Sequence, residues 1–436
     1  MTQQRYRVTP GASLRGALEV PGDKSISHRA LLLNALATGE AQVRGMLEGE
    51  DCLATCRALQ ALGVRIVRQG AGRYDVTGVG RQGFTAPQGP LDFGNSGTGL
   101  RLMAGIAAAQ PFDSVLTGDA SLRQRPMIRI AEPLNQMGAA VETEAGCPPV
   151  TIRGGRVLSA IEYEMPVASA QVKSAILLAG LNAKGRTLIS APGPSRDHTE
   201  RLLQAMGAPL SCHADQVRLD GPADLRAVDI AVPGDFSSAA FFLVAGCLAA
   251  PNGLVVRNVG LNPSRTGLLS ILELMGARIA VHGKRMVGGE PVADLEVTQT
   301  PLTGVSVPAE LVPLAIDEFP VVFAAAAAAE GVTHITGASE LRHKESDRIR
   351  VMAEGLRRVG VRVEEYADGA SIHGGGLRAG EVDSAGDHRV AMAFSVAALV
   401  ADGAIDIHNT ANVATSFPGF DALAVDAGFQ LEVSGD

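Results

Sequence analysis

LELMGARI, at residues 272–279, is one of six copies of the same phrase in a chain of 436 residues. Each copy has a Leu, two or three further residues, a Gly, and then a short strand-like run. The other copies are LQALGVRI (59–66), LNQMGAAV (134–141), LLQAMGAPL (202–210), LRRVGVRV (356–363) and, more loosely, LAVDAGFQL (423–431). The phrase predicts a helix that ends at a left-handed glycine and turns into a strand.

A second feature recurs with the phrase, at a spacing of about 70 residues that exceeds the usual solenoid periods. It is a segment of small apolar residues, which predicts a buried helix because it is apolar nearly all round. The six segments are ALLLNALATG, LRLMAGIAAA, VKSAILLAGL, AAFFLVAGCLA, VVFAAAAAAEG and VAMAFSVAALVA. Six units of two helices and several strands, divided three plus three, predict a two-domain α/β protein. A single doubly wound sheet remains an alternative, although GNSGTG (94–99) is not the dinucleotide fingerprint.

The composition limits the class of protein. Hydrophobic residues make up 46% of the chain, enough for two or three cores, and the net charge of −8 argues against nucleic-acid or anionic-membrane partners. Five scattered cysteines indicate reduced thiols, and we expect Cys52 and Cys56 to be core thiols rather than a metal pair. The first residues lack a signal-peptide core and the apolar runs are short for a bilayer, so we expect a soluble cytoplasmic protein.

Polar and ionic residues gather just before the apolar segments. These clusters are PGDKSISHR (21–29), DFGNSGTGLR (92–101), ASAQVK (168–173), PGDFSS (233–238), IDEFP (316–320) and GDHR (386–389). A helix N-terminus offers unpaired N–H groups and a partial positive charge, so it attracts anions. Several such termini predict an anion site in an acidic protein. Ordinary N-capping remains the alternative for each cluster, above all for PGDFSS.

Cationic side chains accompany these helix starts. Lys24 and Arg29 are not needed to cap the helix that follows them, and Lys24-Ser25 lacks the rest of a P-loop, so ATP binding is not indicated. Arg123, Arg125 and Arg129 form either a solvated basic run or a grip for carboxylate or phosphate, which the planar guanidinium suits.

Carboxylates stand among cations in LRHKESDRIR (341–350). If this segment is helical from about Glu345, then Glu345 and Arg348 share a face and Lys344 lies near them. The alternative is a salt-bridged surface helix. Asp317 precedes an Ala-rich segment, where it could be a simple cap. No spacing typical of a metal site is present.

In this order, PGDKSISHRALLLNALA, LDFGNSGTGLR, GDASLRQRPM, ASAQVKSAILLAGL, SRDHTE, KESDR, DHRVAM and TSFPGF closely resemble the 5-enolpyruvylshikimate-3-phosphate synthases over essentially the whole chain. ASAQVKSA and SRDHTE resemble the bacterial subgroup that includes glyphosate-tolerant members. The resemblance implies an α/β fold, a two-domain inverse α/β barrel in which each domain has three βαβαββ repeats. It implies one domain from residues 1–22 and 234–436, a second from residues 23–233, and an active site in the cleft between them. Crossings near Gly22 and Pro233-Gly234 would form the hinge.

The resemblance also implies the chemistry. Such enzymes transfer the enolpyruvyl group of phosphoenolpyruvate to the 5-hydroxyl of shikimate 3-phosphate and release phosphate, with no cofactor and no metal. We expect a monomer whose only partners are these substrates. Asp317 is the expected base for the hydroxyl, and Glu345 is the expected acid at C3, with Lys24 as its neighbour or alternative. The residues expected to bind phosphoenolpyruvate are Lys24, Gly97, Arg125, Gln171, Arg348 and Arg389. Those expected to bind shikimate 3-phosphate are Lys24, Ser25, Arg29, Ser169, Ala170, Gln171, Arg196, Asp317 and Lys344.

Three positions modify these expectations. Thr415 stands where the enterobacterial pattern has a Lys, and Glu340 stands where it has an Asn, so contacts there are not carried over. Gly97 stands where tolerant members carry Ala, so we expect inhibition by glyphosate. Two alternatives remain at this point. A UDP-N-acetylglucosamine enolpyruvyl transferase would need a loop Cys, which residues 118–126 lack. A non-catalytic anion-binding repeat protein leaves Asp317 and Glu345 unexplained.

Overall fold

Each of the six phrases forms a helix that ends as its glycine predicts. The computed structural model describes residues 4–213 and 215–435. The glycines at 63, 138, 207, 276, 360 and 428 all have φ between +86° and +112°, the left-handed region. The helices that they terminate are α2 (Glu50–Ala61), α4 (Ile128–Gln136), α6 (His198–Ala205), α8 (Gly267–Leu274), α10 (Arg348–Arg358) and α12 (Phe420–Ala427).

The six apolar segments form the predicted buried helices. They are α1 (Lys24–Leu36), α3 (Gly97–Ala107), α5 (Ala170–Gly180), α7 (Phe236–Ala249), α9 (Phe319–Ala328) and α11 (His388–Ala397). Nearly every residue of α7 and α11 is buried, as burial on all sides requires of a helix without a polar face. None of the helices in the described chain combines the length and hydropathy that crossing a membrane would require. Short 3-10 turns lie at Leu122–Gln124, Ala309–Leu311, Ser339–His343, Ala398–Val400 and Thr410–Thr415.

The chain divides into two compact units. Unit 1 comprises residues 1–21, 233–286 and 291–436, of which 1–3 and 436 lie outside the described residues, and unit 2 comprises 22–232 and 287–290. The chain therefore passes between the units at Pro21–Gly22 and Val232–Pro233. It also passes twice more at the tip of a hairpin, residues 287–290, which no sequence pattern had indicated.

The sheets of unit 2 share one strand order, which the second repeat shows in full as β6-β7-β9-β8. β6 and β7 are parallel, and β9 pairs antiparallel with both β7 and β8. The strands of unit 2 are β3 (Ala37–Arg44), β4 (Arg65–Gly70), β5 (Arg73–Val79), β6 (Leu91–Asp92), β7 (Ser114–Thr117), β8 (Ala140–Glu144), β9 (Cys147–Arg153), β10 (Glu162–Glu164), β11 (Gly185–Ser190), β12 (Leu210–His213), β13 (Gln216–Gly221), β14 (Leu225–Arg226) and β15 (Ile230–Ala231).

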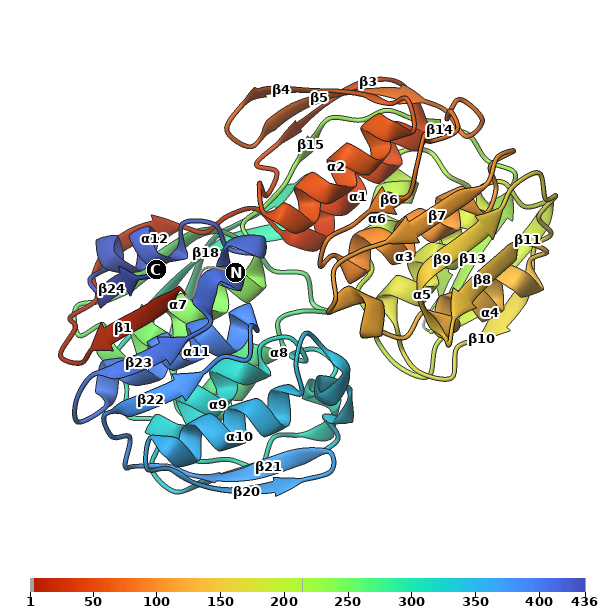
Figure 1. The fold of residues 1–436 in the computed structure, drawn as a ribbon. Coiled ribbons are helices and arrows are strands. Elements are labelled where there is room, and N and C mark those ends of the chain that lie inside the picture. The colour runs from red at the N-terminus through yellow and green to blue at the C-terminus, as the bar shows by residue number, and fades with distance from the viewer. Residues whose placement is uncertain (1–3, 214, 436) are drawn as a thin grey trace. The chain divides into compact units, whose positions relative to one another are not determined.

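Two sheets of unit 1 repeat the same order with one substituted strand each, and the third, β19-β21-β20, lacks the first strand among the described residues. Its strands are β1 (Arg5–Thr9), β2 (Gly16–Glu19), β16 (Leu254–Gly260), β17 (Arg278–Val287), β18 (Glu290–Thr298), β19 (Val332–Ile335), β20 (Arg362–Tyr366), β21 (Gly369–His373), β22 (Gly380–Asp383), β23 (Ile405–His408) and β24 (Gln430–Ser434). β1 supplies the fourth strand of the last repeat and lies between β23 and β24 (Figure 1). β2 precedes α1 in sequence but pairs with β16, while β14 and β15 occupy its place beside β3. The structure thus confirms an α/β fold of two units built from βαβαββ repeats.

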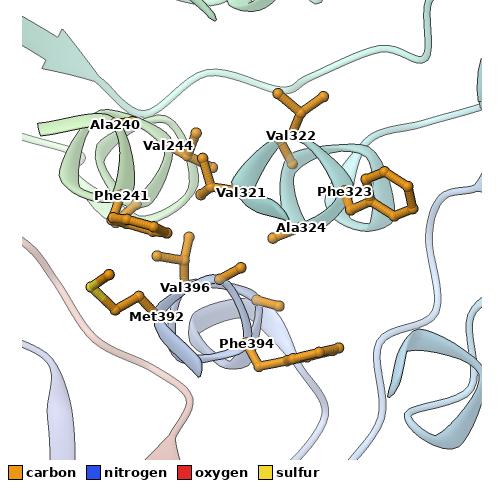
Figure 2. Close-up of a cluster of buried hydrophobic side chains, with 14 of the residues drawn as sticks. Ala240, Phe241, Val244, Val321, Val322, Phe323, Ala324, Met392, Phe394 and Val396 are labelled. Atoms are coloured by element: carbon orange, nitrogen blue, oxygen red, sulfur yellow. The ribbon is translucent and has the colours of Figure 1, made fainter. Parts of the chain in front are cut away.

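The three buried helices of each unit form its core. In unit 1, side chains from α7, α9 and α11 point toward one another, among them Val244, Val321 and Val396 (Figure 2). In unit 2, α1, α3 and α5 contribute to a second continuous apolar cluster, which includes Cys52 and Cys56. Both are buried within α2 and neither forms a disulfide, as expected of core cysteines. Because these helices are fixed in the cores, the polar residues at their N-termini are held in place.

Candidate active site

The predicted substrate-binding residues of unit 2 cluster at the N-terminal ends of its buried helices. Lys24 is the first residue of α1, and the Asp23 side chain caps this helix by accepting from Ile26 N–H at 2.8 Å. The Lys24 ammonium therefore has no part in the cap. Its Nζ lies 3.0 Å from Asp51 Oδ2, and Asp51 is buried in the first turn of α2. Lys24 is thus oriented by a carboxylate 27 positions away, which the sequence pattern did not identify.

The Gly-rich segment 94–99 forms the start of α3. Ser96 caps the helix by accepting from Gly99 N–H at 3.0 Å, and Gly97 is the first helical residue. A Cβ at Gly97 would lie 3.0 Å from Arg101 Nη1 and 3.4 Å from Arg125 Nη1. Two guanidinium groups therefore lie against this backbone, where they reinforce the attraction of the helix N-terminus for anions.

Of the three arginines in the predicted basic run, only Arg125 is buried in this cluster. Arg125 is buried and donates from Nη2 to Asn95 Oδ1 at 2.6 Å, whereas Arg123 is exposed and Arg129 is half-buried. Arg101, which sequence reasoning missed, is buried on α3 and donates to Gln171 Oε1 at 2.6 Å. Its signal was present in the sequence, because an Arg stands within an otherwise apolar helix.

Further predicted residues lie at the starts of α5 and α6. Ser169 caps α5, Ala170 and Gln171 open that helix, and the Gln171 amide donates to Thr98 Oγ1 at 2.9 Å. Arg29 is buried and donates to Thr199 Oγ1 at 2.6 Å, to Ser174 Oγ and to Ser25 O. Burial, together with the charge of Arg196, lowers the pKa of Arg29 to about 10, although nearby carboxylates oppose the shift. These residues and the Gly97 cluster form the unit 2 half-site.

The hairpin tip supplies one further contact within unit 2. His198 Nδ1, at the start of α6, lies 2.7 Å from Glu290 Oε1, and both side chains are buried. With Asp197 they are the one group of the described residues that is close enough to hold a metal ion. Arg201 pairs with Asp197 at 2.9 Å and also donates to Gly289 O. Because a guanidinium already engages this group, it does not suit a cation.

The predicted residues of unit 1 converge on one buried guanidinium. Arg348 opens α10, with its side chain 1% exposed, and donates from Nε to Asp387 Oδ2 at 2.8 Å and from Nη2 to Glu345 Oε2 at 2.6 Å. Burial alone would lower the pKa of Arg348, but Asp387, Glu345 and Asp317 outweigh it and raise the pKa above its usual range. Burial likewise opposes ionisation of Asp387, yet Arg348 and His388 hold the Asp387 pKa below its ordinary value.

Asp317 lies beside this network, between two cations. Its Oδ1 is 3.5 Å from Arg348 Nη1 and 3.6 Å from Lys344 Nζ, and Lys344 also pairs with Glu340 at 3.0 Å. Arg348 Nη1 is a buried nitrogen that makes no hydrogen bond among the described residues. It therefore offers donors beside a carboxylate that is still partly exposed.

Arg389 completes the unit 1 half-site, which consists of Asp317, Lys344, Glu345, Arg348 and Arg389. Asp387 caps α11 by accepting from Arg389 N–H at 2.9 Å. The Arg389 side chain donates from Nη1 to Asp317 O at 3.1 Å and lies 3.8 Å from Glu318. Asp387 thus binds Arg348 and also fixes the helix start that carries Arg389, a double role that a single cap residue does not reveal in sequence.

One local prediction was wrong. The helix was expected to begin at about Glu345, but α10 begins at Arg348 and Asp347 is its cap. The Asp347 side chain accepts from Arg350 N–H and pairs with Arg342, so Asp347 fixes the start of α10. Glu345 therefore lies in a bend before the helix, where it still reaches Arg348.

This fold, with cations and carboxylates at its helix starts, is that of the enolpyruvyl transferase class. The structure of the enolpyruvyl transferase NikO from Streptomyces tendae aligns with a TM-score of 0.81 over 100% of both chains at 18% identity, which supports the fold. EPSP synthase from Acinetobacter baumannii aligns with a TM-score of 0.89 at 49% identity, over 99% of this chain and 100% of that one.

Sequence relatives give the family itself. The profile described as EPSP synthase (3-phosphoshikimate 1-carboxyvinyltransferase) matches residues 8–423. Proteins named 3-phosphoshikimate 1-carboxyvinyltransferase are 57% identical in Alkalilimnicola ehrlichii, over 98% of this chain and 96% of that one, and 56% identical in Acidithiobacillus ferrooxidans, over 99% of both. The chain belongs to the EPSP synthase family. These matches favour this family over the UDP-N-acetylglucosamine enolpyruvyl transferases and over a non-catalytic protein.

Proposed function

We propose that this protein transfers the enolpyruvyl group of phosphoenolpyruvate to the 5-hydroxyl of shikimate 3-phosphate and releases phosphate, a step of aromatic amino-acid biosynthesis. The family match supports the activity. The observation that carries the chemistry is the Arg348 network, in which one buried guanidinium lies against Asp317 and Glu345. Carboxylates among so many cations suit a reaction that moves protons between anionic substrates.

Each carboxylate has a separate role in the proposal. Asp317 takes the proton of the 5-hydroxyl as that oxygen attacks C2 of phosphoenolpyruvate. Glu345 delivers a proton to C3, with Lys24 as the alternative acid, and a tetrahedral intermediate forms. This intermediate then loses phosphate from C2 and returns a proton from C3 to the same acid, which restores the C2–C3 double bond of the enolpyruvyl group. The Arg348 and Lys344 cations beside Asp317 stabilise negative charge as it develops.

The substrate anions are assigned to the two half-sites. Lys24, Arg125, Gln171, Arg348, Arg389 and the backbone at Gly97 bind phosphoenolpyruvate in the proposal. Ser25, Arg29, Ser169, Ala170, Gln171, Arg196 and Lys344 bind shikimate 3-phosphate, together with Lys24 and Asp317. Because Arg29 already donates to Thr199, Ser174 and Ser25, its proposed contribution is to order these neighbours and to add positive charge.

We further propose that substrates bring the two half-sites together by closure of the two domains, since each half-site carries only part of the required chemistry. The domains are those expected from the family, residues 1–22 with 234–436, and 23–233. The protein is proposed to act as a monomer in the cytoplasm, without nucleic-acid or membrane partners. The net charge of −8 supports the absence of nucleic-acid and anionic-membrane partners.

Glyphosate is proposed to inhibit the enzyme, although the chain resembles the subgroup with tolerant members. Gly97 leaves open the space that a Cβ would fill 3.0 Å from Arg101 Nη1 and 3.4 Å from Arg125 Nη1. An inhibitor longer than phosphoenolpyruvate needs that space. Millimolar glyphosate should therefore abolish turnover of the wild-type protein and inhibit Gly97→Ala much less. Equal inhibition of the two proteins would contradict the steric argument.

The decisive experiment measures phosphate release from phosphoenolpyruvate with and without shikimate 3-phosphate. Release should require both substrates. Asp317→Ala and Glu345→Gln should each lower kcat by roughly 10²–10⁴-fold, the usual contribution of acid–base catalysis, while the circular dichroism spectrum stays that of wild type. Release that requires UDP-N-acetylglucosamine instead, or full activity of both variants, would reject the proposal.

A further inference from the structure

His28 is a completely buried histidine that the proposed reaction does not use. It lies on α1, four residues after Lys24, and its two ring nitrogens contact two other helices. Nδ1 is 2.8 Å from Thr55 Oγ1 on α2, and Nε2 is 3.3 Å from Ser96 Oγ at the start of α3. The imidazole therefore joins three elements of unit 2.

On the α3 side, the His28 ring contacts Ser96, which caps the helix whose first turn belongs to the proposed phosphoenolpyruvate site. Ser96 Oγ accepts from Gly99 N–H at 3.0 Å, so the rotamer of Ser96 determines how the first turn of α3 is held. Gly97, in that turn, lies against Arg101 and Arg125. A shift of Ser96 would move the backbone N–H groups and the two guanidiniums relative to a bound anion.

On the α2 side, the His28 ring contacts Thr55, which packs against the same first turn of α3. A Cβ at Gly99 would lie 2.6 Å from Thr55 Oγ1 and 3.0 Å from Ser96 Oγ, so the backbone of α3 touches Thr55 directly. Thr55 and Ser96 are both buried. Since interiors are close-packed, the hydroxyl of Thr55 cannot reorient without disturbing either Gly99 or His28.

The neutral state of the His28 ring suits a bridge between the two hydroxyl groups. Burial, and then the charges of Lys24 and Arg29, lower the pKa of His28 to about 3, against a weaker opposing effect of Asp23. The ring is therefore neutral at physiological pH. A neutral imidazole has one N–H donor and one nitrogen acceptor, so it can bond a hydroxyl on each side in either tautomer.

We propose that His28 is a positioning residue for phosphoenolpyruvate: it bridges Thr55 and Ser96 and thereby fixes the anion-binding first turn of α3. The inference rests on the proposed function and adds a residue to it. His28 itself touches no substrate in this scheme. Its removal should raise the KM for phosphoenolpyruvate more than the KM for shikimate 3-phosphate, because none of the proposed shikimate 3-phosphate ligands lies on α3.

Steady-state kinetics of matched variants tests the proposal. His28→Leu removes both bonds and should raise the KM for phosphoenolpyruvate about tenfold, the effect of one to two lost hydrogen bonds. His28→Gln retains a donor and an acceptor and should recover part of the loss. Thr55→Val should raise the same KM to a smaller extent. The control is Asn34→Leu, because Asn34 is buried on the same helix and bonds Val228 N–H and Val228 O, away from the half-site.

The outcomes separate this inference from the proposed function. If the wild-type protein does not turn over the two substrates, the proposed function fails. If wild type is active but His28→Leu matches Asn34→Leu in both KM values, or raises the two KM values equally, His28 is only structural and the inference is wrong. Should His28→Leu not fold, an unchanged KM for phosphoenolpyruvate in both His28→Gln and Thr55→Val would overturn it.

Discussion

Arg348 is a large, fully buried cation, and it is held by carboxylates from three segments. A buried ion pair adds little net stability, because desolvation of both charges offsets their attraction. Loss of one partner is a different matter, since it leaves the other charge buried and unpaired. Asp387 therefore orders the site but makes the stability of the protein depend on a single carboxylate.

Replacement of Asp387 should reveal that dependence. Asp387→Ala should lower the free energy of unfolding by about 3–5 kcal/mol, as expected when a buried pair is broken. The measurement is urea denaturation of the variant beside wild type. The control is Glu364→Ala, which breaks a pair with the exposed Arg362 and should change stability by less than about 1 kcal/mol. Similar losses in the two variants would show that Arg348 finds other partners.

His28 should make stability fall in mild acid. Its folded-state pKa of about 3 lies below the ordinary histidine pKa of 6.5, so protons favour the unfolded chain. Its contribution is complete above pH 6.5 and is lost as the pH falls from 6.5 towards 3. Between pH 7 and pH 5 the wild-type protein should lose about 2 kcal/mol through this group.

Denaturation at both pH values checks this expectation. His28→Gln lacks the titrating ring, so its stability should fall less over that interval by about the same amount. Other groups titrate in both proteins and cancel in the comparison. Equal losses would mean that His28 gains a proton in the folded state without penalty.

Helices α3 and α5 approach each other closely at Gly105, and this approach determines how a substitution there changes stability. Ala normally stabilises a helix interior by about 1 kcal/mol relative to Gly. A Cβ at Gly105, however, would lie 2.3 Å from Ala175 O on α5. Gly105→Ala should therefore destabilise the protein by about 1–3 kcal/mol, as overpacking does. Thermal denaturation checks the sign, and a higher Tm than wild type would refute the packing argument.

Local patterns predicted most elements because their causes are local. The apolar segments and the glycine-terminated phrases predicted six pairs of helices. Each glycine at a helix end has the expected positive φ. The start of α10 was predicted wrongly, because Asp347 caps the helix and is supported by Arg342, five residues earlier. Contacts over longer separations gave no signal. Asp51 beside Lys24, Thr55 beside His28 and Glu290 beside His198 depend on tertiary packing.

At the scale of the whole molecule, the sequence and its resemblance predicted two sets of three repeats, and the structure has them. The hairpin tip at 287–290 was not predicted, because its strand pattern is that of unit 1 although its last residue is buried against α6 in unit 2. The site residues could be named from the resemblance. The partners that orient them, such as Asp387 and Arg101, required the structure.

Domain closure has a measurable consequence in solution. If both half-sites act on one pair of substrates, shikimate 3-phosphate together with glyphosate should reduce the radius of gyration measured by small-angle X-ray scattering. Asp317→Ala, which keeps most of the anion ligands, should show the same reduction. A radius of gyration that stays unchanged at saturating ligand would mean that the domains do not close on substrates.

The position of β1 sets the order in which a ribosome can complete the protein. Tyr6 is synthesised long before Ile407 and Val433, the two residues with which it pairs. Residues 22–232 are continuous and can fold early, apart from the hairpin tip that joins them later. Until β23 and β24 are made, β1 has no partner strand and its apolar side chains are exposed. The nascent chain therefore carries an unpaired, aggregation-prone strand. Chaperones that bind unpaired strands during translation should therefore raise the yield of this protein. Their effect should be smaller on a protein whose neighbouring strands are synthesised consecutively.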